Sequence, residues 1–284
     1  MRINTNIASL TAQEANTNTN LNLQNSLEKL SSGLRINKAS DDASGLAIAD
    51  KLRTQASSIK QSIANGNSAV SLIQIADKAM AEQSNILDMI KQKLIQGSTA
   101  TTSDEGRVSI GKDISKLLTQ LNEVANQTNY NGIALLQGAS GHNSKSEKLT
   151  FQMGEKADNT AELEGAVQAN TAGLTGMSAL KVSAAAGTWS AGDVRAYMDD
   201  VDSALNQLNT WRADFGSTQN QIESGIRNMM TQVTNIKAAE SVIRDVDYAA
   251  ESANFNKQNI IAQAGTYAMS QANQVQQNVL KLLQ

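Results

Sequence analysis

The chain has 284 residues and a formal net charge of −3 at pH 7, which gives no basic surface for nucleic acid or an anionic membrane. It contains no cysteine, and this excludes disulfides, thiolate metal sites and cysteine nucleophiles. It also contains no proline, and aromatic residues make up only 3% of it. Because proline interrupts helices and aromatic residues fill thick cores, this composition favours long helices that meet along narrow interfaces.

The first 40 residues carry an apolar stripe and very little charge. Between residues 3 and 27 the one charged side chain is Glu14, and asparagine, glutamine, serine and threonine are frequent. A helix with a single narrow stripe cannot bury it alone, so residues 1–40 are predicted to be an assembly helix that neighbouring copies complete. The stripe consists of Ile3, Ile7, Leu10, Leu23, Leu27, Leu30 and Leu34.

A turn is predicted where this helix gives way to the next. Asp41 and Asp42 precede Gly45, a position from which a carboxylate caps a helix; the spacing lacks the alternating oxygen ligands of a calcium loop. Together with Arg35, these aspartates are also expected to form ion pairs between elements or between copies of the chain.

Residues 41–137 are predicted to form two bundle helices. The segment 97–106 interrupts the helical pattern, and Thr102 with Glu105 offers a capping box for the second helix. Apolar residues recur at heptad spacing on both sides of the break. They are Ile59, Ile63, Val70, Ile73, Met80, Leu87 and Leu94, then Ile110, Ile114, Leu117, Leu121 and Val124.

The middle of the chain, residues 138–189, is rich in glycine and has no heptads. "KLTFQM" alternates Leu149, Phe151 and Met153 with polar residues, and "ALKVS" does so with Leu180 and Val182. Both are predicted to be short strands of a small β-hairpin region, and residues 155–176 a loop.

Residues 190–244 carry the longest periodic pattern. Fifteen positions follow one another at alternating steps of four and three residues without interruption, and twelve of them are apolar. At 1.5 Å per residue such a helix spans roughly 75 Å. The positions are Val194, Met198, Val201, Leu205, Leu208, Arg212, Phe215, Gln219, Ile222, Ile226, Met229, Val233, Ile236, Glu240 and Ile243.

The last segment, residues 245–284, resembles the first in character. Between residues 258 and 284 the one charged side chain is Lys281. An unpaired charge buried between identical subunits would cost several kcal/mol, whereas amides can donate and accept hydrogen bonds there. We therefore predict a second assembly helix, whose stripe is Ile261, Ala264, Ala268, Ala272, Val275, Val279 and Leu282.

The whole pattern predicts a mainly α fold: a long antiparallel helical bundle or coiled-coil rod with a small β-hairpin region in the middle. Nothing in it supports a catalytic site, a metal site or a cofactor. His142 is the single histidine, and "DFG" at 214–216 has no glycine-rich loop or catalytic loop beside it. The start lacks the apolar stretch of a signal peptide, so if the protein leaves the cell, it does so by a route that needs no such signal.

Several long motifs resemble those of bacterial flagellins, in the same order. "SLEKLSSGLRINKASDDASGLAIADKLR" (26–53) is similar to their most recognisable stretch, and "QAGTYAMSQANQVQQNVLKLL" (263–283) to their carboxyl-terminal signature. "QTNYNGIALLQG" and "IRDVDYAAES" match between them. The resemblance covers about residues 1–137 and 190–284. Gln276 departs from it, because many flagellins have proline there.

The resemblance implies a secreted structural subunit that self-assembles into the helical flagellar filament and serves motility. It implies export through the flagellar secretion apparatus, with an export chaperone, the filament cap and hook-junction proteins as further partners. In this family the terminal helices line the tube, so the stripes at both chain ends are expected to be polymer interfaces. Neither nucleic acid nor a membrane is expected as a partner.

Two further expectations follow from the resemblance. Flagellins detected by the innate Toll-like receptor carry arginine, glutamate and leucine on one bundle helix and glutamate on the next. Alignment through "ADKAMAEQSNILDMIKQKLIQ" places Met89, Gln92, Lys93 and Asp113 at these positions, so weak or no activation is expected. Flagellins are also often O-glycosylated in the variable region, where the candidate acceptors are Ser140, Ser144, Ser146 and Thr171.

Other classes of protein remain open at this point. A hook–filament junction protein has similar ends but a limited assembly, and it is the nearest alternative. A secreted enzyme would need a large middle insert with metal ligands such as HExxH, and none is present. A soluble coiled-coil binding module would oligomerise without its first 30 residues.

Overall fold

The structure is a computed structural model that describes residues 5–137, 148–163, 167–186 and 191–282. The chain forms two compact units, one made of Met1–Ala56 with Thr234–Gln284 and the other of Ser57–Val233. The boundaries between these units fall inside α2 (Ala43–Ser98) and α5 (Ala191–Arg244). The five segments predicted from the sequence were instead divided where the sequence changes in character, so the two divisions do not correspond. The division into five segments stays a prediction.

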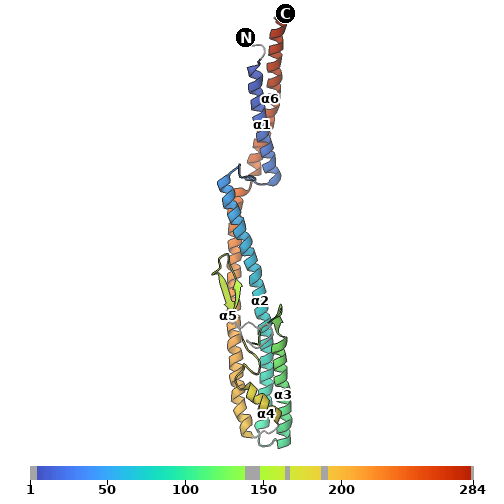
Figure 1. The fold of residues 1–284 in the computed structure, drawn as a ribbon, viewed down its shortest axis with the longest axis vertical. Coiled ribbons are helices and arrows are strands. Elements are labelled where there is room, and N and C mark those ends of the chain that lie inside the picture. Colours follow the sequence, from blue (N-terminus) through green and yellow to red (C-terminus); the bar gives the residue numbers. More distant parts are fainter. Residues whose placement is uncertain (1–4, 138–147, 164–166, 187–190, 283–284) are drawn as a thin grey trace. The chain divides into compact units, whose positions relative to one another are not determined.

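Six helices account for most of the described residues (Figure 1). This agrees with the mainly α prediction, and the long helices follow the heptad patterns closely. The helices are α1 (Ile7–Ser32), α2 (Ala43–Ser98), α3 (Asp104–Gln127), α4 (Met177–Ala186), α5 (Ala191–Arg244) and α6 (Tyr248–Leu282).

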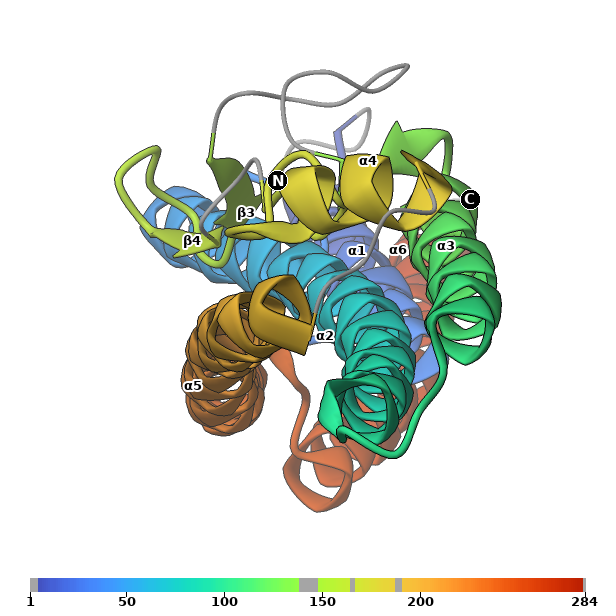
Figure 2. The same cartoon turned by 90° about the horizontal axis from the view of Figure 1, so that it is seen from below.

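The unit Ser57–Val233 is an antiparallel bundle in which α2 lies between α3 and α5 (Figures 1 and 2). Arg212 of α5 forms an ion pair with Asp77 of α2 at 2.9 Å, and Lys91 forms another with Asp202. Gln83, which is fully buried in α2, donates to the main-chain oxygen of Leu121 in α3 at 3.3 Å. Polar contacts therefore fix the register on both sides of α2.

The predicted heptad residues form much of the core along the long helices, together with residues outside the predicted series such as Leu72, Ile90 and Leu118. All fifteen positions from Val194 to Ile243 are buried or half-buried, so the prediction for α5 is confirmed. In α2 and α3 the predicted positions are likewise buried or half-buried. At Gly66 an added Cβ would stand 3.0 Å from the side chain of Ile226, so this glycine permits the close approach of α5.

Two small antiparallel hairpins accompany the helices. The first pairs β1 (Asn129–Tyr130) with β2 (Ile133–Ala134), and the second pairs β3 (Leu149–Gln152) with β4 (Thr160–Leu163). The strand predicted in "KLTFQM" is confirmed as β3. Its partner β4 lies within the stretch predicted to be a loop, which was wrong in that part.

The strand predicted in "ALKVS" is wrong, because Leu180 and Val182 lie in α4. Leu180 is buried and Val182 is 72% exposed, as the two faces of a surface helix require. Ser103, and not Thr102, caps α3: its hydroxyl oxygen accepts from the N–H of Gly106 at 3.1 Å. The Thr102 hydroxyl donates instead to the main-chain oxygen of Gln96 at 2.8 Å.

Candidate assembly surface

The helices α1 and α6 pair antiparallel at the ends of the chain (Figure 1). Near one end the side-chain amide of Asn6 donates to the main-chain oxygen of Ala272 at 3.1 Å. Near the other, the amide of Asn254 donates to the Ser26 hydroxyl at 3.4 Å. The paired helices therefore run in register over most of the length of α1.

The face of α1 that meets α6 is mostly small and polar. Only Thr19 and Ser26 are buried, and the Thr19 hydroxyl donates to the main-chain oxygen of Ala15 at 2.9 Å. Apart from Glu28 and Lys29 near the end of the helix, the buried and half-buried positions recur at steps of three and four. They are Asn6, Ser9, Ala12, Asn16, Thr19, Leu23, Ser26 and Leu30.

The face of α6 that meets α1 has a regular heptad spacing, but its register differs from the predicted one. Of the predicted positions with described side chains, Ala272 alone is half-buried, whereas Ile261, Ala264, Ala268 and Val275 are exposed. The half-buried positions mostly lie one residue further along. They are Glu251, Phe255, Gln258, Ala262, Gly265, Met269, Ala272 and Gln276.

Large apolar side chains point away from the α1–α6 interface. In α1, Leu10 is 55% exposed and Leu21 is 53% exposed, and their spacing of eleven residues amounts to about three helical turns. In α6, Tyr267 is 74% exposed and Val275 is 54% exposed. We call this set the outer apolar face: Ile7, Leu10, Leu21, Leu27, Ile260, Ile261, Tyr267 and Val275.

The outer apolar face includes residues that the predicted stripes omitted, namely Leu21, Ile260 and Tyr267. Ile7, Leu10 and Leu27 belong to the predicted stripe, but they face away from α6, whereas Leu23 and Leu30 face it. Ile3 lies outside the described residues, and so do the side chains of Val279 and Leu282.

Backbone pairing joins the ends of α1 and α5. Gly33 ends α1 with a φ of 73°, a left-handed conformation that glycine tolerates. Beyond it, Leu34 bridges Asp245; the N–H of Arg35 donates to the main-chain oxygen of Arg244 at 2.7 Å, and that of Val246 to the oxygen of Gly33 at 3.0 Å. The segment that leaves α1 and the segment that enters α6 are thus held together at one point.

The predicted capping by Asp41 and Asp42 is present at this junction. A carboxylate oxygen of Asp41 accepts from the N–H groups of Lys38 and Asn37, both at 3.0 Å, and these bonds lower the pKa of the Asp41 carboxyl. Asp42 accepts from the N–H of Gly45 at 2.9 Å. Both aspartates therefore serve the backbone of the turn.

The predicted ion pairs do not appear within the described part of the chain. The Arg35 guanidinium donates to the main-chain oxygen of Ile243 at 2.6 Å, and neither Asp41 nor Asp42 stands within ion-pair distance of a cation. The junction instead holds a pair between Lys38 and Glu28 at 2.5 Å, which raises the pKa of the Lys38 ammonium. Ion pairs between copies of the chain stay a prediction.

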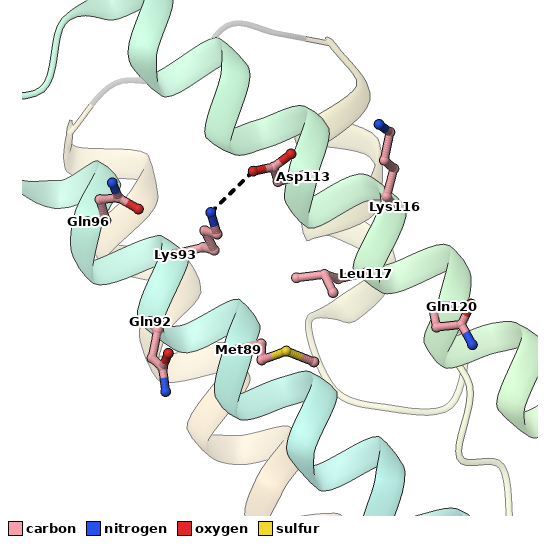
Figure 3. Close-up of a pocket in the computed structure, with 8 residues that line it drawn as sticks. All are labelled: Met89, Gln92, Lys93, Gln96, Asp113, Lys116, Leu117 and Gln120. Atoms are coloured by element: carbon pink, nitrogen blue, oxygen red, sulfur yellow. Dashed lines mark hydrogen bonds and ion pairs between the residues drawn. The ribbon is translucent and has the colours of Figure 1, made fainter.

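A groove of about 660 Å³ lies between α2 and α3 (Figure 3). Met89, Gln92 and Lys93 line it from α2, and Asp113 faces them from α3. The Lys93 ammonium forms an ion pair with the Asp113 carboxylate at 3.2 Å. The four residues aligned with the receptor-binding positions therefore border one groove.

Comparison with known proteins identifies the family. Residues 3–141 match the bacterial flagellin N-terminal helical region, and residues 198–283 match the bacterial flagellin C-terminal helical region. The chain is 38% identical to a flagellin of Bacillus subtilis over the full length of both proteins. The chain belongs to the bacterial flagellin family. Since this is a family of filament proteins, the chain is a structural subunit of the bacterial flagellar filament.

Other relatives agree with this membership. The flagellar filament 33 kDa core protein of Treponema phagedenis is 35% identical over the full length of both chains. A solved structure of a putative flagellar hook-associated protein from Vibrio parahaemolyticus has a TM-score of 0.51. Its sequence identity is 13%, with 72% of this chain and 97% of that one covered, and the likeness shows the fold alone.

One candidate glycosylation site of this flagellin is not suited to that role. Thr171 is 8% exposed, and the amide of Asn122 in α3 donates to its hydroxyl at 3.0 Å. A glycosyl donor cannot reach a buried hydroxyl, so the expectation for Thr171 is wrong. Ser140, Ser144 and Ser146 lie outside the described residues, as does His142.

Other kinds of site have no geometry to support them in the described parts of this flagellin. Across residues 5–137, 148–163, 167–186 and 191–282, no three of the histidine, aspartate or glutamate side chains are grouped as a metal ion requires. Within the same residues, none of the helices is long and apolar enough to cross a membrane.

Proposed function

We propose that the outer apolar face is the surface through which neighbouring flagellin subunits hold one another in the filament. The observation that carries the proposal is the orientation of the terminal helices: α1 turns mostly small and polar side chains towards α6, and both helices carry large exposed apolar side chains on the outside. Exposed apolar patches mark interaction sites, because their removal from water stabilises a complex. The surface is also nearly uncharged, so subunits approach without burying unpaired charges.

The test is deletion of residues 1–30, followed by size-exclusion chromatography before and after addition of filament seeds. The truncated chain is expected to stay monomeric, while the thermal melting of the bundle 57–233 changes little. Full-length chain handled identically is the control. Oligomers of the truncated chain would instead favour a coiled-coil module that assembles through its bundle.

Seeded growth also separates the filament subunit from a hook–filament junction protein. A filament subunit elongates seeds into long tubes, whereas a junction protein stops after a short adaptor. The junction alternative is not favoured, because the match to flagellins covers the whole chain at 38% identity. Electron microscopy of seeded samples measures the tube length.

The remaining partners follow from family membership alone. The subunit leaves the cell through the flagellar secretion apparatus, an export chaperone holds its carboxyl-terminal helix beforehand, and the filament cap and hook-junction proteins contact it outside. Co-purification of the chaperone with full-length chain, but not with chain lacking residues 248–284, tests the chaperone step. Mass spectrometry of secreted protein tests O-glycosylation at Ser140, Ser144 and Ser146. No catalytic role forms part of this function.

Weak or absent Toll-like receptor activation is the expected consequence of the groove between α2 and α3. Lys93 is cationic where the detected pattern has leucine, and it is paired with Asp113. The combined replacements Met89→Arg, Gln92→Glu, Lys93→Leu and Asp113→Glu restore the pattern and should raise potency in a reporter-cell assay. Gln96→Glu, at the edge of the same groove, is the control. Strong activation by the unmodified chain would contradict this expectation.

A further inference from the structure

Two Asn–Gly pairs, identical in sequence, stand in different structural settings. Asn131–Gly132 forms the turn between β1 and β2, whereas Asn65–Gly66 lies inside α2. We propose that Asn131 is a site of spontaneous deamidation in the folded protein and that the helix protects Asn65. The reaction consumes water alone, and it is separate from assembly of the filament.

The chemistry involves only the turn itself. The backbone nitrogen of Gly132 loses its proton to a base in the solvent and attacks Cγ of Asn131. A nitrogen–carbon bond forms, the bond from Cγ to Nδ2 breaks, and ammonia leaves after taking up a proton. Water then opens the resulting succinimide ring to aspartate or isoaspartate, so the net change replaces ammonia with water.

The turn leaves both reacting groups free. Asn131 has a φ of 50° and Gly132 a φ of 80°, as a two-residue type I′ turn requires. Both residues are exposed, and a Cβ added at Gly132 would meet nothing within 4 Å. Among the described residues, none forms a hydrogen bond with the Asn131 side chain or accepts one from the Gly132 N–H.

The short strands let this turn open at low cost. Each strand of the hairpin has two residues, and the register joins Asn129 to Ala134 and Tyr130 to Ile133. Isolated two-stranded hairpins are marginally stable, and local opening is cheapest where few contacts hold the backbone. The backbone of the turn can thus rotate to bring the Gly132 nitrogen onto Cγ of Asn131 without unfolding a helix.

The side chain of Asn65 is hydrogen-bonded and the following glycine is buried, in contrast to Asn131 and Gly132. Its side-chain nitrogen donates to the main-chain oxygen of Gln152 at 3.4 Å, and its oxygen accepts from Gln61 at 3.1 Å. Gly66 is buried, and a Cβ there would stand 3.0 Å from Ile226. Attack by the Gly66 nitrogen requires several turns of α2 to unfold first.

The products would alter the end of the first hairpin. Either product adds a negative charge to the turn. Isoaspartate also lengthens the backbone by one methylene, so a two-residue loop can no longer join Tyr130 to Ile133 in the present register. Leu135 and Leu136, which are buried directly after β2, are expected to confine the change to the turn.

The test incubates the full-length chain at mildly alkaline pH, once in native buffer and once in guanidinium chloride, and follows the peptides that contain Asn65 and Asn131 by mass spectrometry. Fragment ions assign the modified residue. In native buffer Asn131 should gain the acid form at least about tenfold faster than Asn65, because the reaction at Asn65 requires α2 to unfold locally and the reaction at Asn131 does not. In denaturant the two rates should agree within about threefold, because the sequences that react are the same.

The variant Asn131→Gly keeps a residue that tolerates positive φ and removes the reactive amide. Its peptide should gain no acid form, while the rate at Asn65 stays unchanged. The proposal is overturned if native protein modifies both sites at equal rates, or if Asn131 reacts only in denaturant. Seeded assembly of each sample shows that the chain incubated in native buffer remains competent.

Discussion

Replacing three residues of the outer apolar face should weaken filament growth without unfolding the monomer. The triple variant Leu10→Gln, Leu21→Gln and Val275→Gln changes side chains that are 55%, 53% and 54% exposed. Glutamine retains good helix propensity, and Leu10 and Leu21 do not face α6. The monomer should therefore keep its helices.

The expected size of the effect follows from the apolar surface still exposed. Full burial of a leucine or valine side chain contributes about 1.5–3 kcal/mol, so burying the remaining half contributes about 1 kcal/mol. Three such residues give about 3 kcal/mol for each subunit added, and 1.4 kcal/mol corresponds to a tenfold change in an equilibrium constant. The concentration of subunit left unassembled should rise about a hundredfold.

Sedimentation of seeded filaments measures this quantity directly, as the protein concentration that stays in the supernatant. Val182→Gln is the matched control, because Val182 is 72% exposed on α4 and lies outside the outer apolar face. Circular dichroism of each monomer measures its helix content. An unchanged supernatant concentration for the triple variant, with monomer helicity intact, would refute the assignment of this face to assembly.

Three further predictions concern the stability of the subunit. Phe215→Ala removes a core side chain that is 3% exposed, and the free energy of unfolding in urea should fall by about 3–5 kcal/mol; a loss below about 1 kcal/mol would contradict tight packing of α5. Gly33→Ala places a Cβ 2.8 Å from the phenolic oxygen of Tyr248 at a φ of 73°, and the melting temperature should drop; adding Tyr248→Phe should recover only part of the loss, because the backbone strain remains. The pKa of Asp41 is lowered on folding, chiefly by the hydrogen bond from the N–H of Lys38, so the Asp41 carboxylate stabilises the fold at pH values above its ordinary pKa of 3.8. This stabilisation is lost as the pH falls through the pKa of the folded state. In acid titrations of stability, Asp41→Asn should lack this part of the pH dependence, and a profile identical to that of the unmodified chain would show that the hydrogen bond contributes nothing.

The longest helix could be predicted because one physical requirement decides its pattern. Every heptad position from Val194 to Ile243 is buried or half-buried, even where Arg212 or Gln219 interrupts the apolar series. In this helix the apolar side chains face a partner within the same chain. Hydrophobic periodicity and the buried face therefore coincide.

In the terminal helices α1 and α6, the apolar periodic face and the buried face differ. In α6 several large apolar residues, such as Ile261 and Val275, are exposed, and the contacts to α1 come mostly from the neighbouring register with Ala262 and Gly265. A periodic pattern shows that a face must be buried, but not by which chain. That the stripes serve assembly stays a prediction, and the contact between α1 and α6 is made mostly by other residues of the two helices.

Short elements and individual polar residues depended on tertiary context. "ALKVS" fits a strand or a helix equally well by period, and the alanines that follow it favour α4. Thr171 is buried because Asn122 of α3 donates to its hydroxyl and accepts from its backbone N–H at 2.8 Å. No local pattern places these two residues together, 49 positions apart.

The bridge between Leu34 and Asp245 fixes the register of α1 relative to α6, because it holds the end of α1 beside the segment that precedes α6. From the bridge, the contacts of Ser26 with Asn254 and of Asn6 with Ala272 are reached after nearly equal numbers of residues in the two helices, counted backwards along α1 and forwards along α6. A single inserted residue in either helix would rotate everything beyond it by about 100° and misplace the outward side chains. Length changes in one terminal helix are therefore expected to be tolerated only with a compensating change in the other, or in whole heptads.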